Sequence, residues 1–488
     1  MDSTGYSEEQ TRDASDWFSP ILVKELRQGT RSRAFVWSFL ALHTVLLLLI
    51  ITALLTAASP HSNYDQVFVT GFFWTLISIP LLLVLPGIGF GGLKKELDAK
   101  TLELIFLTRM TTLRIVFGKW AALVIQGFLF VSAILPYMIL RYFLGGVNLV
   151  DELRILLLLM LGSLCLTAAA VGLSSITSKA FRLGIIIAVL FFLIQGLFTS
   201  MAIFYGARGL FMTFGTADGW SWLFLFFSVP LFIILMLEFG AGRIAPPAEN
   251  HALRKRLTGL VLLAGGIAVY FGTNGSWWAP VVVAIPLLII CIEAVNENLR
   301  SYGILLRARR AQGKRFAAPV RFLAPGWPGG VIFTALVTAV YLALLLTDST
   351  TEPEHILALL TLSGAILLPV ALIRLAAPDT ERGFVFFVLI QVIMLCAGIC
   401  ALVFAETTYF AASGFFELLP IPLLMLMLGD HLSGSTNASV NVMVFVNAIS
   451  LVALLATGMT ATRRTVATTS SAHPGQAPQR QPLAPETP

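Results

Sequence analysis

Charged side chains are scarce in this chain. Of its 488 residues, 12% are charged and 57% are hydrophobic, whereas a soluble domain carries about 25% charged residues. The shortage excludes an ordinary soluble domain and indicates a membrane protein, because a helix crosses a hydrocarbon layer of roughly 30 Å only with about 20 mostly apolar residues. The first 33 residues are polar and do not resemble a cleavable signal peptide, so we expect the amino terminus to remain attached.

The sequence also lacks the parts of a nucleotide or metal site. No GxxxxGK[ST] motif occurs, and the loops are too short to fold a nucleotide-binding domain, so any ATP-driven motor is a separate polypeptide. Cys396 and Cys400 would share a helix face, but no histidine or acid lies near them. Since all four cysteines fall within apolar runs, we predict no disulfide, no metal and no cofactor in this chain. The other two cysteines are Cys165 and Cys291.

Apolar runs recur along the whole chain. They predict an all-α polytopic membrane protein of about twelve transmembrane helices in a 6 + 6 arrangement. The apolar stretch 415–428 contains Pro420 and Pro422, and its length suits an interfacial or re-entrant piece better than a crossing. The expected spans are 34–58, 67–89, 116–140, 153–176, 183–205 and 220–239 in the first set, and 258–271, 277–295, 327–347, 356–375, 384–405 and 440–459 in the second.

The positions of Lys and Arg fit this topology. With the amino terminus inside, 29 of the 32 lie in cytoplasmic segments, and the exceptions are Arg141, Arg154 and Arg208. A thirteenth crossing at 415–428 would move the tail with Arg464 outside, so we prefer twelve spans with both termini in the cytoplasm. The net charge of +6 then faces an anionic leaflet and requires no nucleic acid partner.

Few polar side chains fall within the expected spans. Interhelical hydrogen bonding explains them better than substrate binding, and no proton relay is visible. Glu238, Glu293 and Arg374 fall near span ends, where we expect them to reach water. The other conspicuous polar residues are His43, Gln126, Gln195 and Gln391.

A short amphipathic helix is expected before the first span. Ser19-Pro20 provides a cap followed by proline at the first helical position. The pattern predicts an elbow helix in the membrane plane, although a simple positively charged flank has the same composition. The expected apolar side is Ile21, Leu22 and Leu26, and the expected aqueous side is Lys24, Glu25, Arg27 and Arg31.

The segment 94–113, between the second and third spans, is far longer than a turn requires. A helix over 94–107 would have an apolar surface and a polar one, and Thr111 or Thr112 could cap the helix that follows. We expect this helix to lie along the membrane surface; a solvated connector is the alternative. Its apolar residues are Leu97, Leu102, Leu104, Ile105 and Phe106, and its polar ones are Lys95, Glu96, Lys100, Thr101 and Glu103.

These motifs, in this order, resemble the type 2 permease family of ABC transporters. The run SPILVKELR at 19–27, the pair Lys95-Glu96 followed by TLEL at 101–104, and Gly118-Lys119 at the third span are similar to that family's elbow, GTLELL and GK motifs. The sequence departs from the family at Ser19, Lys100 and Arg109, where Asn, Gly and Pro are usual. The resemblance covers residues 18–243.

The resemblance implies the permease subunit of an ABC exporter in the bacterial inner (plasma) membrane. ATP and Mg²⁺ would bind to a separate ABC ATPase, this chain would have no enzyme activity, and a second copy or another permease subunit could complete the pathway. The segment 94–113 would be the coupling helix. Its implied ATPase-coupling residues are Glu96, Thr101, Leu102, Glu103, Ile105 and Phe106, and the implied elbow residues are Pro20, Lys24, Glu25 and Arg27.

The expected domains follow from this assignment. They are a cytoplasmic amino terminus with the elbow (1–33), a six-span permease domain (34–243) with a re-entrant piece at 205–219, a second six-span membrane domain (244–464) and a disordered cytoplasmic tail (465–488). The second set of spans is either a degenerate permease half or an accessory domain.

Two other classes of protein have the same general plan. A twelve-span secondary transporter would need acids within the membrane and a short loop at 94–113. A membrane-embedded transferase would need a polar catalytic cluster, for which Asp430-His431 is the nearest candidate.

Overall fold

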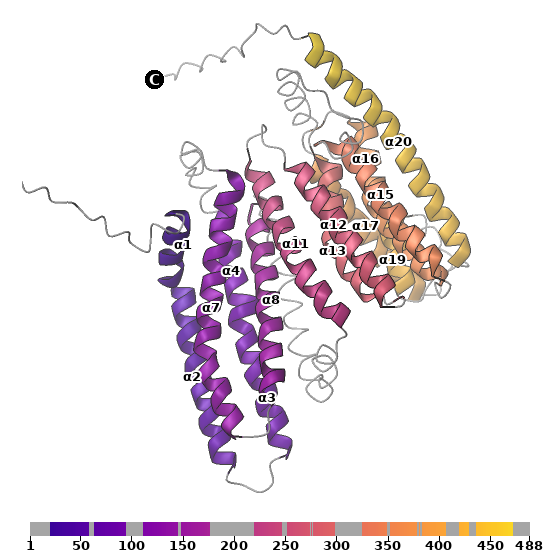
Figure 1. Ribbon diagram of the computed structural model, residues 1–488. Helices are drawn as coiled ribbons and strands as arrows, with labels where there is room; N and C mark the ends of the chain where they lie inside the picture. The colour runs from indigo at the N-terminus through magenta and orange to yellow at the C-terminus, as the bar shows by residue number, and fades with distance from the viewer. Residues whose placement is uncertain are drawn as a thin grey trace, which may run out of the picture. The chain divides into compact units, whose positions relative to one another are not determined.

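The computed structural model describes residues 20–57, 63–93, 111–144, 148–175, 219–245, 251–273, 275, 277–297, 325–348, 352–377, 380, 383–406, 419–428 and 436–471. All regular structure in these ranges is helical, and ten helices are long and apolar enough to cross a membrane (Figure 1). The prediction of a multi-pass, all-α membrane protein is therefore confirmed. The count of twelve spans stays a prediction, because the expected fifth span, 183–205, lies outside the described residues.

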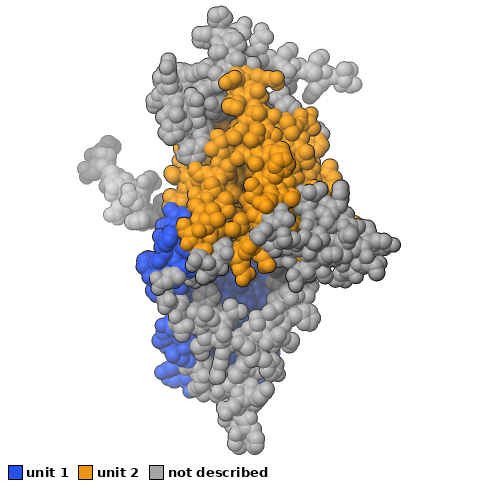
Figure 2. Space-filling model, turned by 90° about the vertical axis from the view of Figure 1, so that its right-hand side faces the viewer, with its two compact units in different colours: residues 1–245, 264–279 blue, residues 246–263, 280–488 orange. Residues whose placement is uncertain are grey.

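The chain divides into two compact units, coloured separately in Figure 2. Unit 1 comprises 1–245 with 264–279, and unit 2 comprises 246–263 with 280–488. α12 (Ala252–Gly272) contributes to both units. It covers the expected span 258–271 but begins with a strongly basic turn, and it is not among the ten apolar helices.

Unit 1 contains a bundle of long helices around an aromatic and aliphatic core. Phe73, Phe130 and Ile134 are among the fully buried members of this core. α7 has 33 residues, about 50 Å at 1.5 Å per residue, and so exceeds the roughly 30 Å hydrocarbon layer. The helices of unit 1 besides part of α12 are α1 (Pro20–Thr30), α2 (Arg33–Ala57), α3 (Asn63–Ile79), α4 (Leu85–Phe90), α7 (Thr112–Leu144), α8 (Leu149–Leu173) and α11 (Gly219–Ile244).

The second span is interrupted by a π-helical turn, η2 (Pro80–Val84), between α3 and α4. The N–H of Leu85 donates to the carbonyl of Pro80, five residues back, and Pro86 has no N–H to donate. The carbonyl of Leu81 therefore loses both of its possible helical donors. The hydroxyl of Ser163 on α8 donates to this carbonyl at 2.8 Å, which satisfies it inside the bundle.

α8 and α11 approach each other closely where both carry glycine. A Cβ added to Gly172 would collide with the backbone carbonyl oxygen of Met236, and one added to Gly240 would lie 2.9 Å from the Cα of Gly172. Small residues permit such contact between helix backbones in a membrane. The two glycines therefore allow the short distance between α8 and α11.

Unit 2 is held together partly by polar contacts between helices. The Asn447 amide donates to the carbonyl of Leu360 at 2.9 Å and accepts from the Ser363 hydroxyl at 2.8 Å, which joins α20 to α16. The hydroxyl of Tyr341 on α15 donates to the carbonyl of Pro280 at 2.8 Å. The helices of unit 2 besides part of α12 are α13 (Trp278–Asn296), α15 (Trp327–Thr347), α16 (Pro353–Ala376), α17 (Gly383–Glu406), α19 (Pro420–Leu428) and α20 (Thr436–Ser471).

The last two helices refine the expectations for the carboxyl-terminal region. α19 has 9 residues, about 14 Å of helix and half of a crossing; residues 415–418 lie outside the described residues, so the re-entrant character of 415–428 stays a prediction. α20 runs to Ser471 and so extends helix into the range 465–488, for which the sequence predicts disorder. The rest of that tail lies outside the described residues.

Candidate functional site

Two of the motifs that resemble the permease family, the run at 19–27 and Gly118-Lys119, meet where α1 packs on α7. α1 begins at Pro20, whose fixed φ suits the first helical position, where an N–H has no helical partner. Its last turn is closed by the Thr30 hydroxyl, which donates to the carbonyl of Leu26 at 2.9 Å. Lys24 and Arg27 are exposed, as the sequence predicts for the aqueous side of this helix.

α7 begins at Thr112, one of the two positions predicted for its start, and the predicted cap by a threonine hydroxyl stays a prediction. The carbonyl of Thr111 accepts the backbone N–H groups of Arg114 (3.0 Å) and Ile115 (3.4 Å), the first hydrogen bonds of the helix. Thr112, the next residue, is fully buried. The third span therefore begins within unit 1 at a fixed point, four residues before the expected 116.

Two glycines allow α1 to lie close against α7. A Cβ added to Gly118 would lie 3.0 Å from Cγ2 of Ile21, so only glycine fits without a shift. Two turns further along α1, a Cβ added to Gly29 would collide with the amide of Gln126. Ile21, Glu25 and Gly29 are four residues apart and therefore lie on one side of α1. This side packs against α7 along the whole of α1 (Figure 1).

An ion pair lies between these two glycine contacts. Glu25 Oε1 and Lys119 Nζ are 2.8 Å apart, with the side chains 19% and 6% exposed. The expectation that Glu25 faces water is therefore wrong. Lys119 lies two turns inside an apolar helix, where a cation requires a counter-ion, and Glu25 is placed one turn from Ile21 to provide it.

The residues that lead into the predicted coupling segment, Gly92 and Leu93, are packed near Lys119. Gly92, just after α4, lies against Lys119, since a Cβ there would be 3.9 Å from Cδ of the lysine. Leu93 is fully buried, and its N–H donates to the Ser174 hydroxyl at 3.4 Å. The predicted coupling residues themselves lie outside the described residues, and they are Glu96, Thr101, Leu102, Glu103, Ile105 and Phe106.

Five residues of α1 and α7 make these contacts. We call Glu25, Gly29, Gly118, Lys119 and Gln126 the elbow clamp. It joins the amino-terminal helix to the third span at the point where the chain enters and leaves 94–110. Over the described part of the chain, no group of three or more His, Cys, Asp and Glu is placed to hold a metal ion.

Two buried ion pairs within the helices were not predicted. Arg141 and Glu152 lie 2.9 Å apart across the α7–α8 hairpin, and Arg141 also donates to the Thr70 hydroxyl at 2.9 Å. Lys255 and Glu293 lie 2.7 Å apart between α12 and α13. The expectation that Glu293 reaches water is therefore wrong.

A second acid extends the polar cluster of unit 2. Glu297 binds Arg256 at 2.7 Å and accepts the N–H of Gly326 at 2.9 Å. Gly326 has φ 120°, a conformation that favours glycine, and it immediately precedes α15. The signal in the sequence for this cluster is the basic turn 254–256 together with Glu293 and Glu297, which are one helical turn apart at the end of α13.

Of the other polar residues singled out in the sequence, some lie as predicted and others do not. The Gln391 amide donates to the carbonyl of Ala365 at 2.6 Å, which confirms an interhelical hydrogen bond. His43 stacks on Phe39 with ring centroids 4.3 Å apart. Glu238 and Arg374 are buried, contrary to expectation, and Arg374 lies over the Trp327 ring at 5.1 Å. Gln195 lies outside the described residues.

Comparison of the whole chain with protein-family models, curated proteins and solved structures gives no match. The class that the described helices define is therefore a polytopic, all-α membrane protein.

Proposed function

We propose that this chain is the transmembrane permease subunit of an ABC exporter, driven by a separate ATPase. The observation that carries the proposal is the elbow clamp. Its Glu25–Lys119 pair joins the elbow run 19–27 to Gly118-Lys119, two motifs that are 94 residues apart and define the family resemblance. A clamp of this kind lets a push on 94–110 move the elbow and the third span together.

The main alternative is a secondary transporter coupled to protons. Buried carboxylates favour it, because such transporters use acids at membrane depth. Here, however, Glu152 is paired with Arg141 and Glu293 with Lys255. In both pairs a basic side chain of a neighbouring helix already occupies the carboxylate, which favours a structural role in holding the helices together.

The test is removal of two predicted apolar anchors, Leu102→Ala with Phe106→Ala. Helix-in-groove docking depends on a few buried side chains, so we expect a loss of at least about 2 kcal/mol, or about thirtyfold in binding the ATPase. The measurement is co-purification of the ATPase and its ATP-driven transport. A cysteine at Thr101 should cross-link to the ATPase. The matched control is Leu40→Ala with Phe128→Ala, which truncates the same residue types at exposed positions on α2 and α7.

If the double variant still binds the ATPase fully and still transports fully, the segment 94–113 only connects two spans. Uptake by the isolated chain in liposomes, driven by a proton gradient without ATP, would instead support the secondary transporter.

A further inference from the structure

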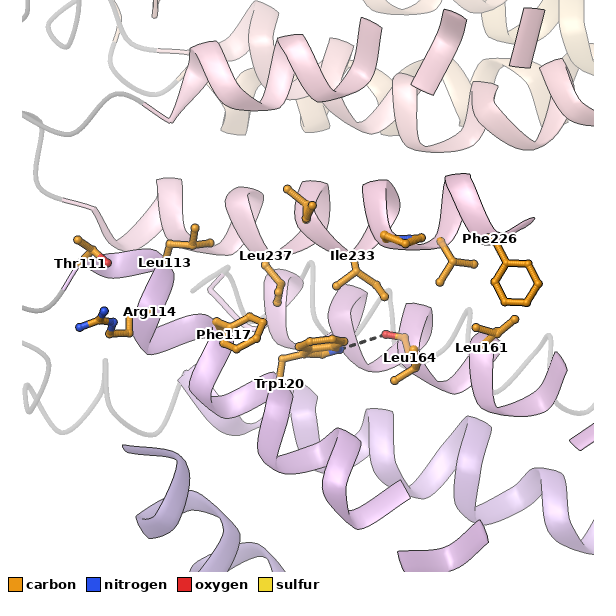
Figure 3. A pocket seen from close by; sticks show the side chains of 13 residues that line it. Thr111, Leu113, Arg114, Phe117, Trp120, Leu161, Leu164, Phe226, Ile233 and Leu237 are labelled. Carbon is orange, nitrogen blue, oxygen red and sulfur yellow. Dashed lines mark hydrogen bonds between the residues drawn. The ribbon is translucent and has the colours of Figure 1, made fainter. Parts of the chain in front are cut away.

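An apolar groove runs along unit 1 between α7, α8 and α11 (Figure 3). Its volume is about 650 Å³, within the roughly 300–1,000 Å³ typical of small-molecule sites. Phe117 and Phe226 are each about half exposed, so the groove is open along its side. A groove of this kind between membrane helices faces lipid or a bound ligand.

The groove is polar at one end only. Thr111 and Arg114 lie at the start of α7, and Phe226 lies at the opposite end (Figure 3). Arg114 is exposed, and it is the one charged residue among the described residues that line the groove. The lining therefore offers a cation at the end of the groove and apolar side chains along the rest.

The length of the groove matches one leaflet. On α11 the lining extends from Phe226 to Leu237, and these 11 helical steps span about 16 Å. Half of a hydrocarbon layer of roughly 30 Å is about 15 Å. The distribution of Lys and Arg predicts that the start of α7 is the cytoplasmic end, which places Arg114 at the headgroup level of the inner leaflet.

The floor of the groove is fixed. The indole N–H of Trp120 donates to the carbonyl of Leu164 on α8 at 3.2 Å, and its ring lies 5.5 Å from that of Phe117. The contact between Gly172 and Gly240 fixes α8 against α11. Direct contacts therefore connect α7 to α8 and α8 to α11 around the groove.

We propose that this groove binds an anionic phospholipid of the inner leaflet. The phosphate lies on Arg114, because guanidinium and phosphate form charge-assisted hydrogen bonds, and one acyl chain lies along Phe117, Trp120 and Ile233. Such a ligand matches the charge at the mouth, the apolar walls and the length of one leaflet. The site requires only a membrane and is independent of the proposed transport function.

The test uses the purified full chain and native mass spectrometry with phosphatidylglycerol and phosphatidylcholine of identical acyl chains. We expect Arg114→Ala to lower phosphatidylglycerol binding about fivefold, equivalent to about 1 kcal/mol, and to lower phosphatidylcholine binding less, because the choline cation cancels the charge of the phosphate and already opposes the arginine. Arg114→Lys should retain most of the binding. The control is Arg463→Ala, which removes an exposed cation near the inner end of α20.

A second measurement reports on the acyl chain. Brominated phosphatidylglycerol should quench more fluorescence in the native chain than in Trp120→Phe, and Ile233→Trp, which fills the groove, should lower phosphatidylglycerol binding even with Arg114 present. Equal loss in Arg463→Ala, or an unchanged headgroup preference in Arg114→Ala, would overturn the proposal. No quenching difference at Trp120 would also overturn it, because the groove would then be filled by another part of the chain.

Discussion

Glu25→Gln tests the elbow clamp most directly. An exposed ion pair contributes about 0–1 kcal/mol, and breaking a fully buried one costs about 3–5 kcal/mol. With side chains 19% and 6% exposed and an N–O distance of 2.8 Å, the Glu25–Lys119 pair lies between these limits. We estimate about 2 kcal/mol, or about thirtyfold in the equilibrium for local opening of α1. Glutamine keeps the shape of the side chain, so the change removes charge only.

The assay is amide hydrogen exchange of α1 in lipid nanodiscs. We expect exchange to accelerate about thirtyfold in Glu25→Gln, and about threefold or less in the control Arg27→Gln, which changes an exposed residue of the same helix. Adding Lys119→Met to Glu25→Gln should restore much of the protection, because the buried cation that lost this carboxylate is then gone. The reasoning is refuted if Glu25→Gln changes exchange less than threefold, or if the second substitution accelerates it further.

Two further predictions concern the fold. Gly240→Leu should destabilise unit 1 by about 3 kcal/mol through collision with α8, measured by thermal unfolding, whereas Gly87→Leu, with no other atom within 4 Å of an added Cβ, should cost about 1 kcal/mol or less; similar melting temperatures would contradict the close crossing. For topology, an impermeant thiol reagent should label Asp348→Cys in intact cells and should not label Arg464→Cys; labelling of the latter would mean an odd number of crossings.

Much of the helical arrangement follows from composition and periodicity. The span 327–347 is predicted at both ends, because Gly326 and Asp348 bound a mostly apolar run. The interruption at Pro80 is not predicted, since hydropathy averages over hydrogen bonds and treats a π turn as part of the span. The donor that makes this turn tolerable, Ser163, is 82 residues away from Leu81.

The sequence singles out four of the five residues of the elbow clamp, all but Gly29, but it does not predict the contact between them. The amphipathic pattern identifies α1, yet it assigns Glu25 to water, because a helical wheel says nothing about what lies opposite. Lys119 was the available signal, since a cation two turns into an apolar helix implies a buried acid. The same logic applies to Lys255 and Glu293, whose separation of 38 residues hides the pair from local analysis.

The π turn has a mechanical consequence for the second span. Bending stiffness in a helix comes from an unbroken ladder of hydrogen bonds, and at Leu81 one rung is replaced by the hydroxyl of Ser163, which belongs to a neighbouring helix. α3 and α4 are thus two short rods joined by a compliant joint. Gly89 holds α4 against α7 and α8, since a Cβ there would lie 2.9 Å from Leu123 and 3.3 Å from Val171, so any bending at this joint changes the direction of α3 relative to α4 and leaves α4 packed in the bundle.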